Sequence, residues 1–286
     1  MHFSLVLSTF GRTKEVEKFL TSLADQSHRD FDLIVVDQNS DDGLVSLIET
    51  YQVSFTISHL RRPDDRGLSK ARNVGLQHVI GDIVTCPDDD CWYPAQLLEQ
   101  VDRCLTENPK VDVISSRTSA GPEKASEDNQ LPSLHQLQQL TSPIQVMRVP
   151  GMWALFLRNH TMKSVGTFDE TLGVGAGTPW GAAEDTDYYL RLLKAGFTLY
   201  ASPRLVVFHP TASDEQVMLR DLGRSYRYGA GATRVWRRHG LPLWYFLYEL
   251  LRSFAGVPLS LLRGRRAKAC WHWGAFRGKL RGWFSR

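Results

Sequence analysis

The sequence predicts an α/β fold built on a central, mostly parallel sheet. Apolar runs of strand length recur through the first ninety residues, and segments with the period of an amphipathic helix separate them. Clusters of polar residues follow these runs, as expected where the carboxyl ends of parallel strands face a ligand. With 286 residues, of which 42% are hydrophobic and 23% charged, the chain can bury a full core.

The first part of the chain, residues 1–94, supplies four predicted strands joined by helical crossovers. The run at 31–37 is almost continuously apolar, which is typical of a strand covered on both faces. We expect the other strands at 3–9, 53–60 and 80–85, and helices at 14–24 and 67–76. Ser69 is a candidate N-cap for the second helix. Right-handed crossovers between these strands predict a Rossmann-like nucleotide-binding half.

The second half of the predicted domain, residues 95–212, mixes helices and strands. We expect a helix at 95–105 and strands at 111–115, 146–157 and 199–208. A stretch rich in Ser, Gly and Pro at 118–132 predicts a loop. The best-defined helix is expected at 182–193, because acidic residues near its start suit the helix dipole and Gly196 closes it.

Three consecutive carboxylates, Asp88, Asp89 and Asp90, follow the predicted strand at 80–85. Like charges this close raise one another's pKa values and destabilise their loop. A hard divalent cation, Mg²⁺ or Mn²⁺, removes this conflict because it prefers carboxylate oxygen and bridges to substrate phosphates. Taken alone, the D-x-D pair of Asp88 and Asp90 is equally compatible with a metal site and with a solvated acidic turn.

The C-terminal quarter has a different composition. Residues 220–286 hold 15 Lys or Arg against two acidic residues, whereas the rest of the chain holds 19 basic and 29 acidic residues. We expect a helix at 216–238, then a mostly apolar stretch at 241–262 that contains Glu249 and Arg252. Two charges near the middle of this stretch disfavour a membrane span. Their i, i+3 spacing is equally compatible with a pair and with the polar face of a helix lying in the membrane interface.

The extension at 213–286 is therefore predicted to attach the protein to an anionic membrane surface. Packing of the apolar helix on the folded domain and binding of nucleic acid are the alternatives, and the long Leu-rich stretch argues against nucleic acid. Four cysteines without a C-x-x-C pattern, and an amino terminus unlike a signal peptide, favour a cytoplasmic location at the inner face of the membrane.

Six segments, in this order, resemble the inverting glycosyltransferases of family 2, which have the GT-A fold. They are residues 8–12, 36–40 and 67–73, Asp88–Asp90 with Pro94, Glu184 with Asp185, and His209. Each is a weak signal alone, but together they span residues 3–210. The resemblance implies a GT-A domain over 1–212, followed by the basic helical extension. It also implies that a sugar passes from a nucleotide donor to an acceptor.

The resemblance further implies a donor site. Asp90 would contact a Mn²⁺ or Mg²⁺ ion, with Asp88 bracketing it and His209 as a further ligand. The residues implied for the nucleotide are Thr9, Arg12, Asp37, Arg72, Asn73, Asp88 and Asp89, of which Asp37 would face the base. The structural alternatives are a helix cap for Asp37, a solvated helix face for Arg72 and an ordinary strand-end histidine for His209.

Inversion at the anomeric carbon needs a base that removes the proton of the acceptor hydroxyl. The resemblance gives this role to Asp185, with Glu184 positioning the acceptor. Trp180 and Gly181 would line the acceptor site, since an indole ring stacks well on a sugar face. The alternative is that both acids only stabilise the N-terminus of their helix.

We therefore expect a metal-dependent, hexosyltransferase-like enzyme that acts in polysaccharide or glycoconjugate synthesis. Its donor would be a nucleotide sugar, with a UDP-sugar as the first candidate, and its acceptor a glycan or a lipid-linked sugar. Two other hypotheses remain open at this point: a nucleotidyltransferase, which also uses aspartate-bound metal, and a membrane-docked scaffold that binds nucleotide without catalysis.

Overall fold

A computed structural model describes residues 1–122, 136–210 and 221–285 of the chain. The chain divides into two compact units. Unit 1 comprises Met1–Arg66, Lys70–Thr167 and Arg191–Thr211, and unit 2 comprises Gly67–Ser69, Phe168–Leu190 and Ala212–Arg286. The expected boundary at 212/213 lies outside the described residues, as do most of the predicted loop at 118–132 and the start of the predicted helix at 216–238.

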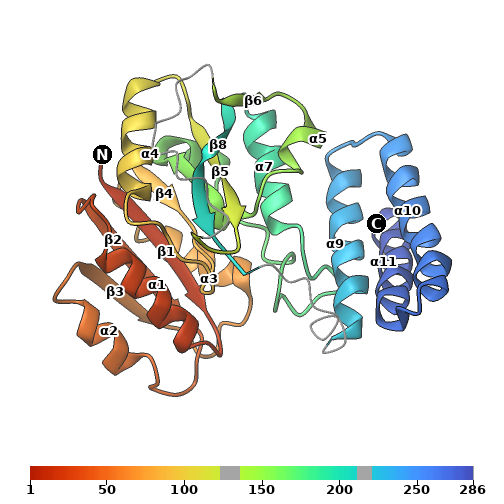
Figure 1. The fold of residues 1–286 in the computed structure, drawn as a ribbon, viewed down its shortest axis with the longest axis horizontal. Helices are drawn as coiled ribbons and strands as arrows, with labels where there is room; N and C mark the ends of the chain where they lie inside the picture. The colour runs from red at the N-terminus through yellow and green to blue at the C-terminus, as the bar shows by residue number, and fades with distance from the viewer. Residues whose placement is uncertain (123–135, 211–220, 286) are drawn as a thin grey trace. The chain divides into compact units, whose positions relative to one another are not determined.

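Unit 1 is built on an eight-stranded sheet with the order β3-β2-β1-β4-β7-β5-β8-β6 (Figure 1). The strands are β1 (Phe3–Thr9), β2 (Phe31–Asp37), β3 (Thr56–Arg61), β4 (Ile83–Thr85), β5 (Val113–Ser119), β6 (Gln138–Leu140), β7 (Leu155–Arg158) and β8 (Leu199–Phe208). β3, β2, β1 and β4 are parallel neighbours, and so are β5 and β8. β7 runs antiparallel between β4 and β5, and β6 is an antiparallel edge. The predicted α/β fold with a mostly parallel sheet is confirmed.

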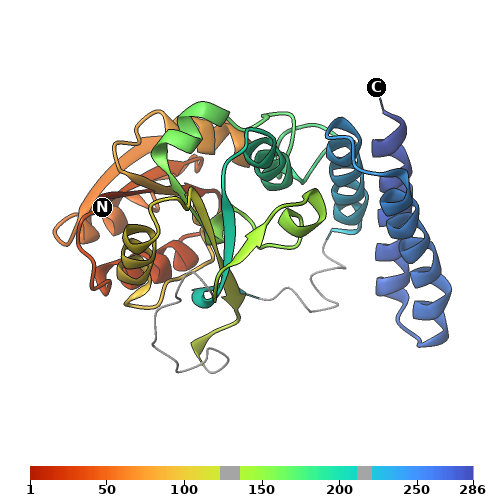
Figure 2. The same cartoon turned by 90° about the horizontal axis from the view of Figure 1, so that it is seen from above.

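Helices cover both faces of the sheet (Figure 2). Those of unit 1 are α1 (Lys14–Ala24), α2 (Val45–Tyr51), most of α3 (Leu68–Leu76), α4 (Leu97–Glu107), α5 (Pro143–Val146), the 3₁₀ helix η3 (Met152–Ala154) and α6 (Asn159–Val165). Alternate residues of β1 point to opposite faces. Leu5 joins the core with Phe19 of α1 and Val101 of α4, whereas Val6 meets α3 where Gly75 leaves room for it.

Several predicted elements differ from the structure. The strand expected at 111–115 is β5, two residues later, and the helix expected at 95–105 is α4, also two residues later. The strand expected at 80–85 is shorter in the structure and consists only of β4. Gly81, just before it, lies so close to β1 that a Cβ atom there would be 2.6 Å from the Ser4 nitrogen. The strand expected from 53 begins at Thr56. Of the strand expected at 146–157, only β7 exists, since Ser142 and Pro143 start α5 with a capping box. Ser69 lies inside α3 and bonds to the Leu172 carbonyl, so it is not an N-cap.

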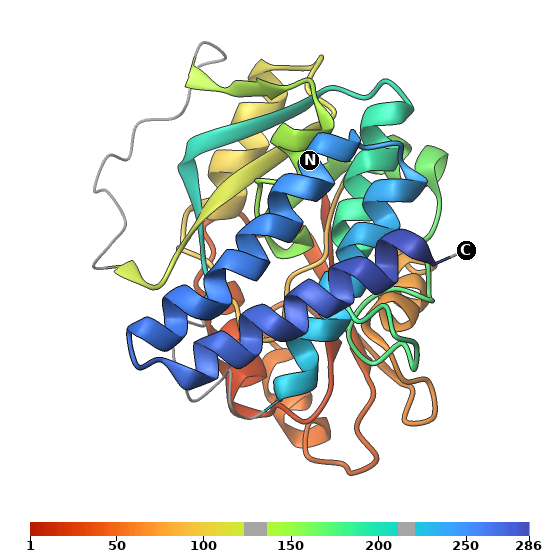
Figure 3. The same cartoon turned by 90° about the vertical axis from the view of Figure 1, so that its right-hand side faces the viewer.

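Unit 2 contains the N-terminal part of α7 (Glu184–Lys194), and the helices α9 (Leu222–Arg238), α10 (Leu243–Leu262) and α11 (Arg266–Phe284). α10 and α11 form a hairpin, and α11 also packs on α9 (Figure 3). Glycines make the α9–α11 contact close: a Cβ atom at Gly278 or Gly282 would collide with the carbonyl of Tyr226 or Ala230. Among the described helices, none is both long enough and apolar enough to cross a membrane.

The two charges in the predicted apolar stretch have partners. Glu249 accepts hydrogen bonds from Arg252 at 2.7 Å and from Lys279 of α11 at 2.8 Å. Lys279 also donates to the Glu249 carbonyl and to the hydroxyl of Ser253, so all three of its protons have acceptors. The hairpin is therefore joined by a buried ion pair, and removing one partner would leave a charge in its interior.

Candidate active site

The acidic cluster lies at the carboxyl edge of the sheet, held between β1 and β8. Asp88 forms an isolated parallel bridge with Ser8 of β1, and Trp92 forms an antiparallel bridge with Phe208 of β8. A hydrogen bond from the Cys91 amide to the Asp88 carbonyl closes the turn between these bridges. Because Phe208 is fixed beside Trp92, the next residue, His209, is brought to the acidic cluster.

Asp88, Asp90 and His209 converge in unit 1. They offer ligand atoms that all lie within 4.8 Å of one another. His209 Nε2 is 3.1 Å from Asp90 Oδ1 and 3.9 Å from Asp88 Oδ2, and its Nδ1 lies 2.8 Å from the Pro210 carbonyl. Since a carbonyl only accepts, Nδ1 carries the proton, and in neutral His209 the lone pair of Nε2 faces the carboxylates. Two oxygen donors and one imidazole nitrogen fit a divalent cation such as Mn²⁺ or Mg²⁺.

Two arginines from different elements compensate the cluster. Arg12, after β1, places Nη1 2.7 Å from Asp89 and 2.6 Å from Asp90. Arg72, on α3, is 1% exposed and contacts Asp88 at 3.0 Å, so it does not lie on a solvated helix face. Asp89 also accepts a hydrogen bond of 2.9 Å from Thr9. Five of the residues implied for the nucleotide (Thr9, Arg12, Arg72, Asp88 and Asp89) are therefore engaged in one charged network.

Burial and pairing act in opposite directions on these groups. Burial raises the pKa of Asp89 above its ordinary value, although Arg12 and Thr9 oppose the effect. Burial also works against ionisation of Asp90, but His209 and Arg12 outweigh it and lower the pKa of that carboxyl. Burial lowers the pKa of His209, and Asp90 and Asp88 reverse this and raise it above the ordinary value. The carboxylates of Asp88 and Asp90 therefore stabilise the positive charge of His209.

Asp37 ends β2 at the same edge of the sheet and is fully buried. One of its carboxylate oxygens accepts from the Asn39 amide at 2.9 Å and from the Asn39 side chain at 2.8 Å, and the other lies 3.0 Å from His59 Nε2 on β3. Burial disfavours the charge, but these hydrogen bonds lower the pKa of Asp37 below its ordinary value. Asp37 does not cap α2, whose N-cap position is Leu44.

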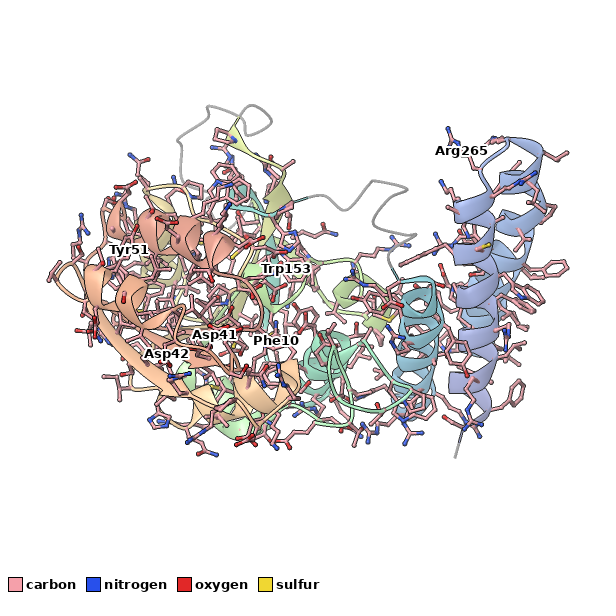
Figure 4. The ribbon with its side chains drawn as sticks, turned by 90° about the horizontal axis from the view of Figure 1, so that it is seen from below. Phe10, Asp41, Asp42, Tyr51, Trp153 and Arg265 are labelled. Atoms are coloured by element: carbon pink, nitrogen blue, oxygen red, sulfur yellow. The ribbon has the colours of Figure 1, made fainter. Side chains whose placement is uncertain are left out.

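Two further residues contribute to the site, and sequence reasoning did not place them there. Asn39 accepts a 2.6 Å hydrogen bond from the Gly11 amide, so it connects the loops after β1 and β2. Figure 4 labels Phe10, Asp41 and Asp42 in these two loops. Trp153 of η3 stacks on His209, with ring centroids 4.7 Å apart, and holds the imidazole plane. Asn73, the remaining residue implied for the nucleotide, is buried on α3.

The implied catalytic acids lie in unit 2, at the start of α7. Glu184 is buried, with its carboxylate against Gly173, where an added Cβ atom would lie 3.1 Å away. Asp185 follows it in the first turn. The residue before them, Ala183, has a φ of +76°, a conformation that costs energy for any residue with a side chain. Strained backbone conformations are concentrated at functional sites, so this turn is a candidate functional site.

The residues implied for the acceptor have structural contacts of their own. One face of the Trp180 indole is covered by the Arg234 guanidinium, 4.6 Å from the ring centroid. Gly181 lies against Arg227 of α9, since a Cβ atom there would be 2.9 Å from the Arg227 Cβ. Asp187 of α7 is buried and pairs with His239 at 2.8 Å and with Arg238 at 3.5 Å. These contacts fix the start of α7 on α9.

The α/β fold on a mostly parallel sheet is the GT-A fold, which solved glycosyltransferases share. The mannosyltransferase PcManGT of Pyrobaculum calidifontis, solved with GDP-Man and Mn²⁺, has a TM-score of 0.64 at 16% identity and covers 99% of this chain and 87% of its own. The 1–349 fragment of TarS of S. aureus, solved with UDP-GlcNAc, has a TM-score of 0.59 at 16% identity and covers 98% and 92%.

The family model for glycosyl transferase family 2 matches residues 4–163, more than half of the sequence. The chain therefore belongs to glycosyltransferase family 2, as its motifs predicted. Among the relatives, an uncharacterized glycosyltransferase of Haemophilus influenzae is 26% identical to this chain. The aligned region covers 69% of this chain and 64% of that protein's length. Glycosyltransferase AglE of Haloferax volcanii is 22% identical over 82% of this chain and 73% of its own length.

Replacing Asp37 by Asn removes the charge that His59 and Asn39 stabilise. Because the pKa of Asp37 is lowered in the folded protein, its contribution is complete above the ordinary aspartate pKa of about 3.9 and is lost as the pH falls through the lowered value. We expect Asp37→Asn to lower the free energy of unfolding by about 1.5–3 kcal/mol near neutral pH. Urea denaturation at a series of pH values should show this difference shrinking below about pH 4.

Asp64→Asn, at an exposed position, is the matched control and should not change the unfolding curve. A difference between wild type and Asp37→Asn that stays constant from neutral to acid pH would contradict the assignment of this charge.

Proposed function

We propose that the protein is a metal-dependent inverting glycosyltransferase, which moves a sugar from a nucleotide-sugar donor to a glycan or lipid-linked acceptor. The observation that carries this proposal is the convergence of Asp88, Asp90 and His209 at the sheet edge where β1 and β2 also end. The family assignment and the donors held by the solved neighbours support it.

Asp88, Asp90 and His209 would hold the Mn²⁺ or Mg²⁺ ion, which would neutralise negative charge on the departing nucleoside diphosphate. Arg12 forms ion pairs with Asp89 and Asp90, and its side chain is 42% exposed. A guanidinium in this place can also bind a diphosphate oxygen. Trp153 keeps the His209 ring in the orientation in which Nε2 faces the carboxylates.

The nucleotide would bind across the ends of β1, β2 and β4. A carboxylate has about four acceptor positions, and the contacts of Asp37 use three of them, which leaves one for a base N–H. Arg72, Asn73, Thr9, Asp88 and Asp89 would complete this site. A UDP-sugar is our first candidate for the donor, because TarS was solved with UDP-GlcNAc, although PcManGT was solved with GDP-Man.

Asp185 would act as the base that removes the proton of the acceptor hydroxyl, with Glu184, Trp180 and Gly181 positioning the acceptor. Its place in the first turn of α7, two residues after the strained Ala183, supports this role. Asp187, by contrast, is occupied with His239 and Arg238 and has a structural role.

We further propose that the extension binds the cytoplasmic face of a membrane. The side chains Trp244, Leu247, Tyr248, Leu251 and Phe254 of α10 recur at helical spacing and are 45–63% exposed. Such an apolar stripe, on a segment with 15 basic residues against two acidic ones, suits an anionic membrane interface. This arrangement would place the enzyme next to a lipid-linked acceptor.

The metal assignment predicts a large loss of activity in Asp90→Asn. With Mn²⁺ and a donor, wild type should release nucleoside diphosphate, and the variant should do so about 100-fold more slowly, because a neutral amide replaces a charged ligand. Asp64→Asn should match wild type. An unchanged rate in Asp90→Asn would refute the metal site, and release of pyrophosphate instead of nucleoside diphosphate would indicate a nucleotidyltransferase.

The base assignment predicts that Asp185→Asn separates catalysis from binding. Sugar transfer to an acceptor should fall about 100- to 10,000-fold, the usual contribution of a general base. Donor affinity, measured by calorimetry with Mn²⁺, should stay within about twofold of wild type. Asp187→Asn is the control on the same helix and should lower thermal stability. Full transfer activity in Asp185→Asn would rule out this base.

Membrane attachment predicts that the exposed stripe of α10 is needed for vesicle binding. The double variant Leu247→Gln and Leu251→Gln keeps the charge and should lower co-sedimentation with anionic vesicles at least about tenfold, because two exposed leucines no longer transfer into lipid. Val53→Gln with Ile80→Gln changes two exposed apolar residues of unit 1 and is the matched control. Equal sedimentation of both variants and wild type would place membrane binding elsewhere or exclude it.

A further inference from the structure

A half-open cavity of about 290 Å³, just below the usual size of ligand pockets, lies beside the turn between α10 and α11. Four basic side chains line it, Arg252, Arg263, Arg265 and Lys268, together with His272 and Ser260. No acidic side chain lines this cavity among the described residues. Figure 4 marks Arg265 at the end of the hairpin.

The backbone fixes the shape of this cavity. Gly264 has a φ of +68° and ends α10 in a Schellman motif, in which the Arg265 amide donates to the Ser260 carbonyl at 2.9 Å. Further along the hairpin, a Cβ atom at Gly256 would lie 2.6 Å from the His272 ring, so the two helices are close there. The positive side chains therefore surround a preformed space.

The charges around the cavity are only partly compensated. Arg252 pairs with Glu249, which Lys279 also contacts. Arg263, Arg265 and Lys268 have no carboxylate within 4 Å in the described part of the chain. Burial lowers the pKa of His272, and the charges of Lys268, Arg252 and Lys279 lower it further. A bound anion would relieve this repulsion, and arginines grouped in this way suit the oxygens of a phosphate.

Exposed apolar residues flank the cavity and indicate the source of the phosphate. Leu259, Leu261 and Leu262 are 48%, 54% and 86% exposed at the end of α10. A phospholipid presents a phosphate group next to fatty-acid chains, which exposed leucines can contact. A single-stranded nucleic acid has no such chains for the leucines to contact. We propose that this pocket binds the headgroup phosphate of an anionic phospholipid. The inference rests on the proposed membrane attachment and adds a defined site to it.

The test compares two double variants of the full-length protein that lose the same charge. Arg263→Gln with Lys268→Gln changes the pocket, and Arg277→Gln with Arg281→Gln changes exposed positions of α11 outside it. With vesicles of phosphatidylcholine containing about 30% phosphatidylglycerol, the pocket variant should bind at least about tenfold more weakly than wild type, and the control within about threefold. Equal losses in both variants would overturn the pocket.

Vesicles of phosphatidylcholine alone separate this inference from the attachment on which it rests. Wild type that sediments with neither vesicle would refute attachment itself. Wild type that binds both vesicles equally, with no effect of the pocket variant, would keep attachment and refute the pocket. Competition by a single-stranded oligonucleotide that the pocket variant no longer binds would show a nucleic-acid site and refute the lipid assignment.

NMR titration of His272 gives a readout that does not depend on vesicles. Soluble dihexanoylphosphatidylglycerol should raise the pKa of His272 in wild type, because a phosphate opposes the neighbouring positive charges. The same lipid should leave it unchanged in the pocket variant. An unchanged pKa of His272 in wild type at saturating lipid would also overturn the proposal.

Discussion

The mutual repulsion of Asp88, Asp89 and Asp90 is the constraint on which the rest of unit 1 depends. Three carboxylates in sequence require positive partners, and the partners come from separate segments: Arg12 after β1, Arg72 on α3 and His209 after β8. These segments meet because their strands end at one edge of the sheet and because Trp92 pairs with Phe208. The fold thus brings opposite charges together at this edge, which supports the proposed binding of a cation and a diphosphate there.

Much of this arrangement could be predicted from the sequence, because its signals are local. The bounds of β1, β2, β8 and α1 follow from hydrophobic periodicity, and the D-x-D pair is visible as a motif. The bounds of β4 and β7 depend on contacts distant in sequence, such as that of Gly81 with Ser4, which periodicity does not contain. The stacking of Trp153 on His209 likewise joins residues without a shared motif, so only the structure reveals it.

For unit 2, the composition predicted helices with basic and exposed apolar side chains. It did not predict how these helices pack on one another. The hairpin of α10 and α11 depends on Gly264 at its turn and on the pairing of Glu249 with Lys279, thirty residues apart. Sequence reasoning offered an i, i+3 pair of Glu249 and Arg252 as one alternative, and the structure contains that pair, but the contact of Glu249 with Lys279 was not predicted. In the structure Glu249 points into the helix contact while Leu251 and Phe254 are exposed, so the helix presents its apolar side outward. The exposed apolar side of α10 is the physical basis of the membrane proposal.

The most direct test of the central claim is the position of a bound metal. Crystals grown with Mn²⁺ and a nucleoside diphosphate, and measured for anomalous scattering of manganese, should show a peak at coordination distance, about 2.0–2.4 Å, from oxygens of Asp88 and Asp90 and from His209 Nε2. The diphosphate oxygens should complete the coordination of the same ion. Nucleotide bound at the sheet edge without a manganese peak among these three side chains would contradict the account.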